Sequence, residues 1–168
     1  ILYVVPSIDV PVKGGALSDA VQRDLWMTNN AMNAGKLMPM CPVHVGQRVR
    51  FTQVLSKEAG LVPETVATVV SIALDPREPA IPKDQKEVIL QYHPVAVYVQ
   101  LDEDDKRTMD YVKEHIPEGL VANRILPIAP FPSRHFAYTY VPPARGATSQ
   151  NYVIMRVQLP LFAARVRT

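Results

Sequence analysis

Residues 46–70 read GQRVRFTQVLSKEAGLVPETVATVV, and this stretch decides how the rest of the chain is interpreted. Two β-like runs, RVRFT and TVATVV, flank a polar stretch centred on AGLVPE. In the first run Val49 and Phe51 share one face. Arg48, Arg50 and Thr52 share the other, because successive side chains of a strand point to opposite faces. The stretch therefore predicts a strand pair with arginines on one outer face.

The composition favours a folded protein built from short strands. The 168 residues are 48% hydrophobic and 20% charged, so the chain can bury a core. Its 16 prolines break long helices and favour short strands joined by stiff loops. We expect a mainly β fold with a minor α part, arranged as a small barrel or sandwich.

Hydrophobic periodicity locates the individual elements. A helix is expected from Asp19 to about Met32, with Asp19 and Gln22 resembling a capping box and Gly35 near its C-terminus. Strands are expected at 1–5, 48–52, 65–74, 87–92, 95–101, 120–128, 136–141 and 151–161, and 111–116 could be a brief helix or strand. In the 65–74 strand, one face should carry Val66, Thr68, Val70, Ile72 and Leu74.

Several classes of function find no support in the sequence. The net charge of +2 gives no global cationic field, so a nucleic-acid partner would have to meet a local patch. The single cysteine, Cys41, excludes an intrachain disulfide and is interpreted as a buried, unreactive thiol. No apolar run is long enough to span a membrane. No catalytic triad motif and no phosphate loop is present, so we expect no catalysis and no bound cofactor in this chain itself.

A metal site has one acidic candidate. The run 102–105 contains four carboxylates, which suit Mg²⁺ or Ca²⁺, but it lacks the spacing and glycine of a calcium loop. A solvated turn is the favoured interpretation. The histidines His44, His93, His115 and His135 are isolated and do not have zinc spacing.

Basic and aromatic residues form the more informative set. Guanidinium groups bind phosphates through paired hydrogen bonds, and aromatic faces stack on unpaired bases. The candidates for nucleic-acid binding are Arg48, Arg50, Lys57, Arg134, Tyr138 and Arg145. The alternative is that arginines alternating along an antiparallel strand simply face water.

Four blocks in a fixed order resemble the PIF-family DNA helicases, which are ATP-driven, RecD-like motors of superfamily one. The first is GKLMPMCPVHVGQRVRFTQVLSKEAGLVPETVATVVSI (35–72), similar to the family's "VGxRVxLTxNL…GLVNGTxGxV" run. HPVAVYVQLDE (93–103) and GLVANRILPIAP (119–130) follow at the right distance. RVQLPLFAARVRT (156–168) resembles the phrase that precedes the family's His-Lys-(Ser/Ala)-Gln-Gly signature.

The resemblance implies an architecture and a function. Residues 41–145 would carry a small Src-homology-type β-barrel inserted in the second RecA-like domain. Residues 1–40 would be a flanking strand-helix piece, and 146–168 the strand returning to that domain. The chain would be a non-catalytic part of a 5′-to-3′ DNA helicase that helps to form the single-stranded DNA path, as in DNA repair and recombination. ATP and Mg²⁺ would belong to the parent helicase, and the partners would be single-stranded DNA and the rest of the helicase chain.

One departure from the family pattern concerns the turn between the first two strands. Where the family has Asn-Gly, this chain has Pro63–Glu64, and proline fixes φ near −65°. We therefore expect a different turn geometry at this point. A stand-alone, helicase-derived structural or protein-binding barrel stays open as the alternative function, and an enzyme with a metal at Asp102–Asp105 is a third.

Overall fold

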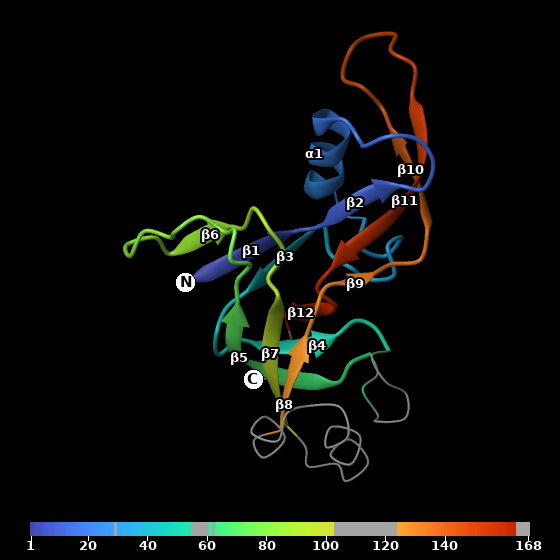
Figure 1. Ribbon diagram of the computed structural model, residues 1–168. Helices are drawn as coiled ribbons and strands as arrows, with labels where there is room; N and C mark the ends of the chain where they lie inside the picture. Colours follow the sequence, from blue (N-terminus) through green and yellow to red (C-terminus); the bar gives the residue numbers. More distant parts are fainter. Residues whose placement is uncertain (29, 55–60, 62, 103–123, 164–168) are drawn as a thin grey trace.

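The computed structural model describes residues 1–28, 30–54, 61, 63–102 and 124–163 (Figure 1). These described residues are mainly β, with one short helix among them, which confirms the predicted fold class. The helix α1 spans Asp19–Met27. The strands are β1 (Leu2–Pro6), β2 (Ile8–Pro11), β3 (Met40–Val43), β4 (Arg48–Phe51), β5 (Val66–Ala73), β6 (Glu87–Ile89), β7 (Ala96–Leu101), β8 (Ile125–Ile128), β9 (Phe131–Pro132), β10 (Phe136–Tyr140), β11 (Gln150–Gln158) and β12 (Leu161–Ala163).

The strands form three sheets. The first has the order β3-β1-β6, in which β1 pairs antiparallel with β3 and parallel with β6. The second has the order β10-β11-β2, with β9 also paired to β11. The third is a five-stranded antiparallel sheet, β12-β4-β5-β7-β8, formed mostly by the segment predicted to carry the barrel.

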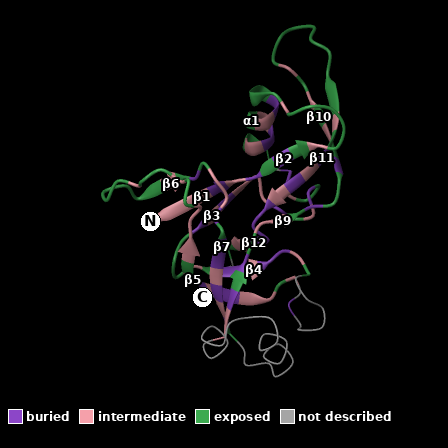
Figure 2. Ribbon diagram, in the orientation of Figure 1, coloured by how far each residue is buried: buried purple, intermediate pink, exposed green. Residues whose placement is uncertain are grey.

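Two hydrophobic cores lie between these elements. The larger core joins the five-stranded sheet to the three-stranded one, and its largest buried side chains include Phe51, Leu159 and Leu161. In the smaller core, Val21 and Leu25 of α1 pack on Phe136 and Ile154 of the second sheet. The buried segments of β7 and β11 in Figure 2 belong to the larger and smaller cores respectively. Strands β4 and β11 show the alternation most clearly, since buried residues recur at every second position of each.

The helix differs from its prediction at both ends. Its N-cap is Ser18, whose Oγ accepts a hydrogen bond from the backbone N–H of Val21 at 3.3 Å, so the predicted Asp19–Gln22 capping box is wrong. The helix ends at Met27 and not near Met32. The backbone is extended at the C-cap Thr28, with ψ 150°, and the Asn30 side-chain amide donates to the carbonyl of Leu25 at 2.9 Å in the last turn.

Four strands, β2, β3, β9 and β12, escaped the sequence analysis. Strand β2 lies between the strand predicted at 1–5 and the predicted helix, and β12 begins where the strand predicted at 151–161 ends. Strands β3 and β9 each contain a proline, at Pro42 and Pro132. Proline removes a ladder donor and usually marks a turn or an edge strand. Strands β2 and β3 do lie at sheet edges, where a missing N–H costs no hydrogen bond.

The predicted face of β5 is also wrong. Ala67 and Val69 are its buried side chains, and Thr68 lies on the other face. A β-bulge between Val69 and Ser71 then shifts the register, so that Ile72 pairs with buried Val97. A bulge adds one residue to one strand and reverses the side-chain phase beyond it. Strict alternation through the whole strand therefore could not hold.

The turn at Pro63–Glu64 keeps one feature of a glycine turn. Glu64 has φ +75°, in the left-handed region that glycine usually occupies. A proline followed by a residue with positive φ is the pattern of a type II turn. The replacement of Asn-Gly by Pro63–Glu64 therefore keeps a left-handed residue in the turn, because Glu64 adopts that conformation. The backbone N–H of Glu64 donates to the carbonyl of Phe51 at 3.0 Å and closes the connection.

Candidate nucleic-acid interface

Strand β4 places two arginines on the outer face of the five-stranded sheet. Val49 and Phe51 are buried in the larger core, and Arg48 and Arg50 alternate with them as predicted. The Arg48 side chain is 47% exposed. Both its terminal nitrogens donate to the Asp102 carboxylate at the end of β7, and Nη1 also donates to Thr68 Oγ1 at 3.2 Å. These hydrogen bonds to Asp102 raise the pKa of the already basic Arg48 guanidinium.

Two partners hold Arg50, one in the turn before β5 and one on β12. Its Nη1 donates to Glu64 Oε2 at 2.7 Å. Its guanidinium carbon lies 4.3 Å from the centroid of the Phe162 ring, which β12 places directly opposite in the strand register. Such a cation–π contact stabilises a guanidinium in a fixed plane. Arg50 is thus less exposed than Arg48 and more tightly positioned.

The charges on this face cancel in pairs. Arg48 faces Asp102, and Arg50 faces Glu64. Exposed ion pairs of this kind contribute only about 0–1 kcal/mol, so an incoming phosphate can exchange with the carboxylate at little cost. A guanidinium also has five N–H donors, more than one carboxylate can use. The face is therefore neutral in the isolated chain, and the Nε of Arg50 is buried with no hydrogen-bond partner among the described residues.

The other predicted site residues lie elsewhere. Tyr138 is on β10, where its half-buried ring packs on the smaller core and its hydroxyl is buried with no hydrogen-bond partner among the described residues. Arg134 and Arg145 are exposed in the loops on either side of β10. Figure 1 places β10 at the opposite end of the molecule from β4, so these residues and the β4 arginines do not form one patch. Lys57 lies outside the described residues.

The metal candidates do not gather into a site within the described residues. No group of three or more His, Cys, Asp or Glu side chains that could hold a metal is found there. Asp102 is engaged with Arg48, and Glu103–Asp105 lie outside the described residues. Of the histidines, His93 contacts the carbonyl of Pro6 at 2.7 Å and His44 contacts that of Val45 at 3.0 Å, whereas His115 is not described.

Cys41 is buried, as predicted. It is 1% exposed, and burial raises the pKa of its thiol to about 12. A thiol with such a pKa is not a nucleophile near neutral pH, because the thiolate is the reactive form. Within the described part of the chain, no helix has the length and apolar character that crossing a membrane requires.

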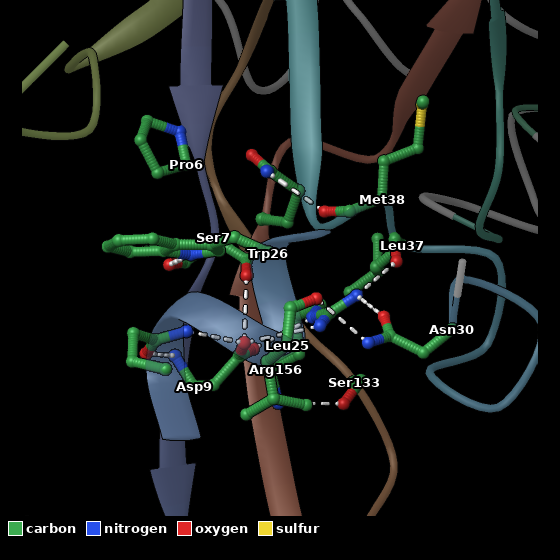
Figure 3. Close-up of polar contacts among 12 residues, drawn as sticks. Pro6, Ser7, Asp9, Leu25, Trp26, Asn30, Leu37, Met38, Ser133 and Arg156 are labelled. Carbon is green, nitrogen blue, oxygen red and sulfur yellow. Dashed lines mark hydrogen bonds and ion pairs between the residues drawn. The ribbon is translucent and has the colours of Figure 1, made fainter. Parts of the chain in front are cut away.

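The sequence analysis missed a buried polar network around Arg156 (Figure 3). Arg156 is completely buried, and its Nε donates to Asp9 Oδ1 at 2.8 Å. Its Nη1 donates to Asn30 Oδ1 at 2.6 Å and to the Leu37 carbonyl at 3.1 Å. Gln22 of α1 donates to the same Asp9 carboxylate at 2.9 Å. The network joins β2, α1, the following turn and β11.

Gln158 extends this inner row of polar side chains along β11. Its Nε2 donates to the carbonyls of Val5 and Met38 at 2.8 and 3.0 Å. The spacing of Arg156 and Gln158, two residues apart, was a usable signal, because both lie on the face that buries Ile154. Residues 156–160 (RVQLP) thus hold the N-terminal strands to β11. The side chains of Arg156 and Gln158 are fully buried, so no ligand reaches them.

No protein-family model matches the chain, and no curated protein matches it. A crystal structure of the Pif1 helicase from Candida albicans is similar at 15% sequence identity, with a TM-score of 0.44. The match covers 97% of this chain and 29% of that chain. A likeness at this level carries no argument about function. What the structure itself defines is a mainly β protein with an arginine-bearing sheet face.

Proposed function

We propose that this chain is a non-catalytic part of an ATP-dependent DNA helicase, and that its five-stranded sheet helps to form the path of single-stranded DNA. The observation that carries this proposal is the outer face of β4, where Arg48 and Arg50 present oriented guanidinium groups. The ordered sequence blocks that resemble the PIF family support it. ATP and Mg²⁺ bind to other parts of the parent helicase, and the 5′-to-3′ polarity and a role in repair or recombination come from the resemblance alone.

The β4 face fits a phosphate backbone better than it fits base edges. Guanidinium groups pair with phosphate oxygens through two parallel hydrogen bonds, and such contacts carry no sequence information. Arg48 and Arg50 lie two residues apart on one strand, so their Cα atoms are separated by roughly 7 Å. That spacing is close to the distance between successive phosphates of an extended strand. The sheet would therefore follow the backbone of a strand of any sequence.

Single-stranded DNA binding at low and moderate salt tests the proposal. Phosphate neutralisation releases counterions, so the affinity should fall steeply as the salt concentration rises. A labelled oligothymidylate in an anisotropy titration provides the measurement. Absence of binding at both salt concentrations would remove the claim that this chain grips DNA.

A stand-alone structural or protein-binding role is the second candidate. It is favoured by the pairing of both β4 arginines with carboxylates and by the outer face of β2 and β11. There Ile8, Val10, Val12 and Val153 are each more than 40% exposed. Exposed apolar surface of this kind is typical of protein contacts. The complete reading frame separates the two candidates, since the helicase requires a phosphate loop and a His-Lys-x-Gln-Gly signature.

A further inference from the structure

A groove of about 710 Å³ is lined by none of the β4 residues. Helix α1, the β1–β2 junction and residues 89–93 form its walls. The lining is mostly apolar and aromatic, and its largest members are Ile8, Trp26, Met27, Met40, Ile89 and Tyr92. Ligand sites in proteins typically have volumes of about 300–1,000 Å³ and a similar lining. The groove is thus large enough for one or two nucleotides.

The two aromatic rings of the groove are held in fixed positions. The indole N–H of Trp26 donates to the carbonyl of Ser7 at 2.9 Å, and Figure 3 shows the ring lying beside Pro6 and Ser7. The Arg77 guanidinium lies 4.2 Å from the centroid of the Tyr92 ring. Asp75 holds Arg77 in turn, with Nη2 and Oδ2 2.9 Å apart. Rings fixed in this way lose little conformational entropy when a ligand stacks on them.

The lining residues of the groove carry one surplus positive charge, and the Glu78 carboxylate next to them is bound to the backbone N–H groups of Gln91 and Tyr92. The charged lining residues are Arg23, Arg77 and Asp75, apart from the titratable His93. Arg77 and Asp75 neutralise each other. Arg23 is exposed, and within the described residues no ion pair or hydrogen bond occupies its guanidinium. A ligand that uses the whole groove therefore combines a flat ring with a negative charge.

We propose that this groove binds an unpaired nucleotide of single-stranded DNA, with the base against Trp26 or Tyr92 and a phosphate on Arg23. This inference rests on the proposed function and adds a second DNA contact, separate from the β4 face. A base provides the planar surface, and its phosphate provides the negative charge that Arg23 lacks. An apolar peptide side chain would fill the apolar wall but would leave Arg23 without a partner.

Trp26 makes the test direct, because it is the only tryptophan of the chain. Its fluorescence reports on the groove, while the anisotropy of a labelled oligonucleotide reports on all DNA binding. The probe is an oligothymidylate of about 12 nucleotides, within the 4–16 nucleotides that small single-strand-binding folds cover. We expect Trp26 emission to be quenched in parallel with the rise in anisotropy.

Two variants with the same change of charge separate the groove from general electrostatics. Arg23→Gln should weaken oligonucleotide binding about threefold to tenfold and lower the salt slope by about 0.7, the value for one phosphate contact on a single strand. Lys83→Gln removes one positive charge from an exposed loop outside the groove and should change neither quantity.

The possible outcomes distinguish this inference from the proposed function. A rise in anisotropy without quenching of Trp26 would overturn the groove inference and leave DNA binding by the chain intact. No change in either signal would contradict both proposals. Quenching by the probe peptide acetyl-Asp-Phe-Val-Asp-amide, and not by the oligonucleotide, would assign the groove to a polypeptide and overturn the inference.

Discussion

Glu64 connects the backbone of a turn to the charge balance of the β4 face. Its φ of +75° is costly for a residue with a Cβ, by roughly 1–2 kcal/mol. Its carboxylate lies 2.7 Å from Arg50 Nη1 and neutralises that guanidinium. The position therefore combines a strained backbone with the carboxylate that competes most directly with a phosphate for Arg50.

Glu64→Asn tests this competition. Asparagine tolerates positive φ and has no charge, so the turn should persist while Arg50 loses its partner. We predict that single-stranded DNA binds about threefold more tightly at low salt, since one phosphate contact no longer displaces a carboxylate. Glu87→Gln, which removes a carboxylate from the exposed edge strand β6, is the matched control in the same anisotropy titration. Equal effects of the two variants would mean that only net charge matters.

His93 makes stability depend on pH. Burial lowers its pKa below 6.5, outweighing the opposing effects of the Pro6 carbonyl and of Asp9. Because the folded pKa is depressed, the unfolded chain binds more protons as the pH falls below about 6.5. The neutral His93 therefore contributes stability above that pH, and the contribution is lost on further acidification through the folded pKa.

The prediction for His93 follows from this sign. In the unchanged chain, the free energy of unfolding measured by urea denaturation should fall as the pH is lowered from 6.5 through the depressed pKa of folded His93. His93→Gln should show a smaller fall over the same window. His135→Gln, at an exposed position, should retain the full fall. A pH profile of His93→Gln that matches the unchanged chain would contradict the assignment.

At the scale of the elements, the buried pair between Asp9 and Arg156 holds β2 to β11. Both side chains are 0% exposed, and the residues are 147 positions apart in the sequence. Removing one partner of a buried ion pair leaves an uncompensated charge and costs about 3–5 kcal/mol. We predict a loss of that size in the free energy of unfolding of Arg156→Met, measured by urea denaturation.

Two further variants check that the loss arises from the unpaired Asp9. Asp9→Asn combined with Arg156→Met should be more stable than Arg156→Met alone, because the amide keeps the hydrogen-bonding capacity without the charge. Arg145→Met, in an exposed loop, should change stability by no more than about 0.5 kcal/mol. A cost below about 1 kcal/mol for Arg156→Met would show that water reaches the pair.

The elements also show what alternation can and cannot predict. Strand β4 was predicted from two arginines alternating with Val49 and Phe51, because a half-buried strand has a period of two. The predicted faces of β5 were wrong beyond the bulge after Val69, because one extra residue in a strand exchanges its two faces. The predicted end of the helix was wrong because the backbone turns extended at Thr28, where the following Asn30 side chain caps the Leu25 carbonyl.

At the scale of the whole molecule, the sequence analysis could not predict contacts between residues that are far apart in the chain. The outward direction of Arg48 and Arg50 was predictable from local sequence, but their carboxylate partners were not. Asp102 is 54 residues from Arg48, and no local pattern links the two. The same holds for Arg156, whose spacing with Gln158 marked an inward face but not the strand that supplies Asp9. Tertiary packing decides such contacts, and periodicity does not encode them.

The central claim is that the β4 face of this molecule holds the backbone of single-stranded DNA. Its most direct test compares the salt dependence of oligothymidylate binding by the unchanged chain and by Arg48→Gln/Arg50→Gln. Each phosphate contact on a single strand contributes about 0.7 to the slope of log affinity against log salt concentration. We predict that the double variant binds more weakly and that its slope is smaller by about 1.4. An unchanged affinity and slope in a folded double variant would contradict the account.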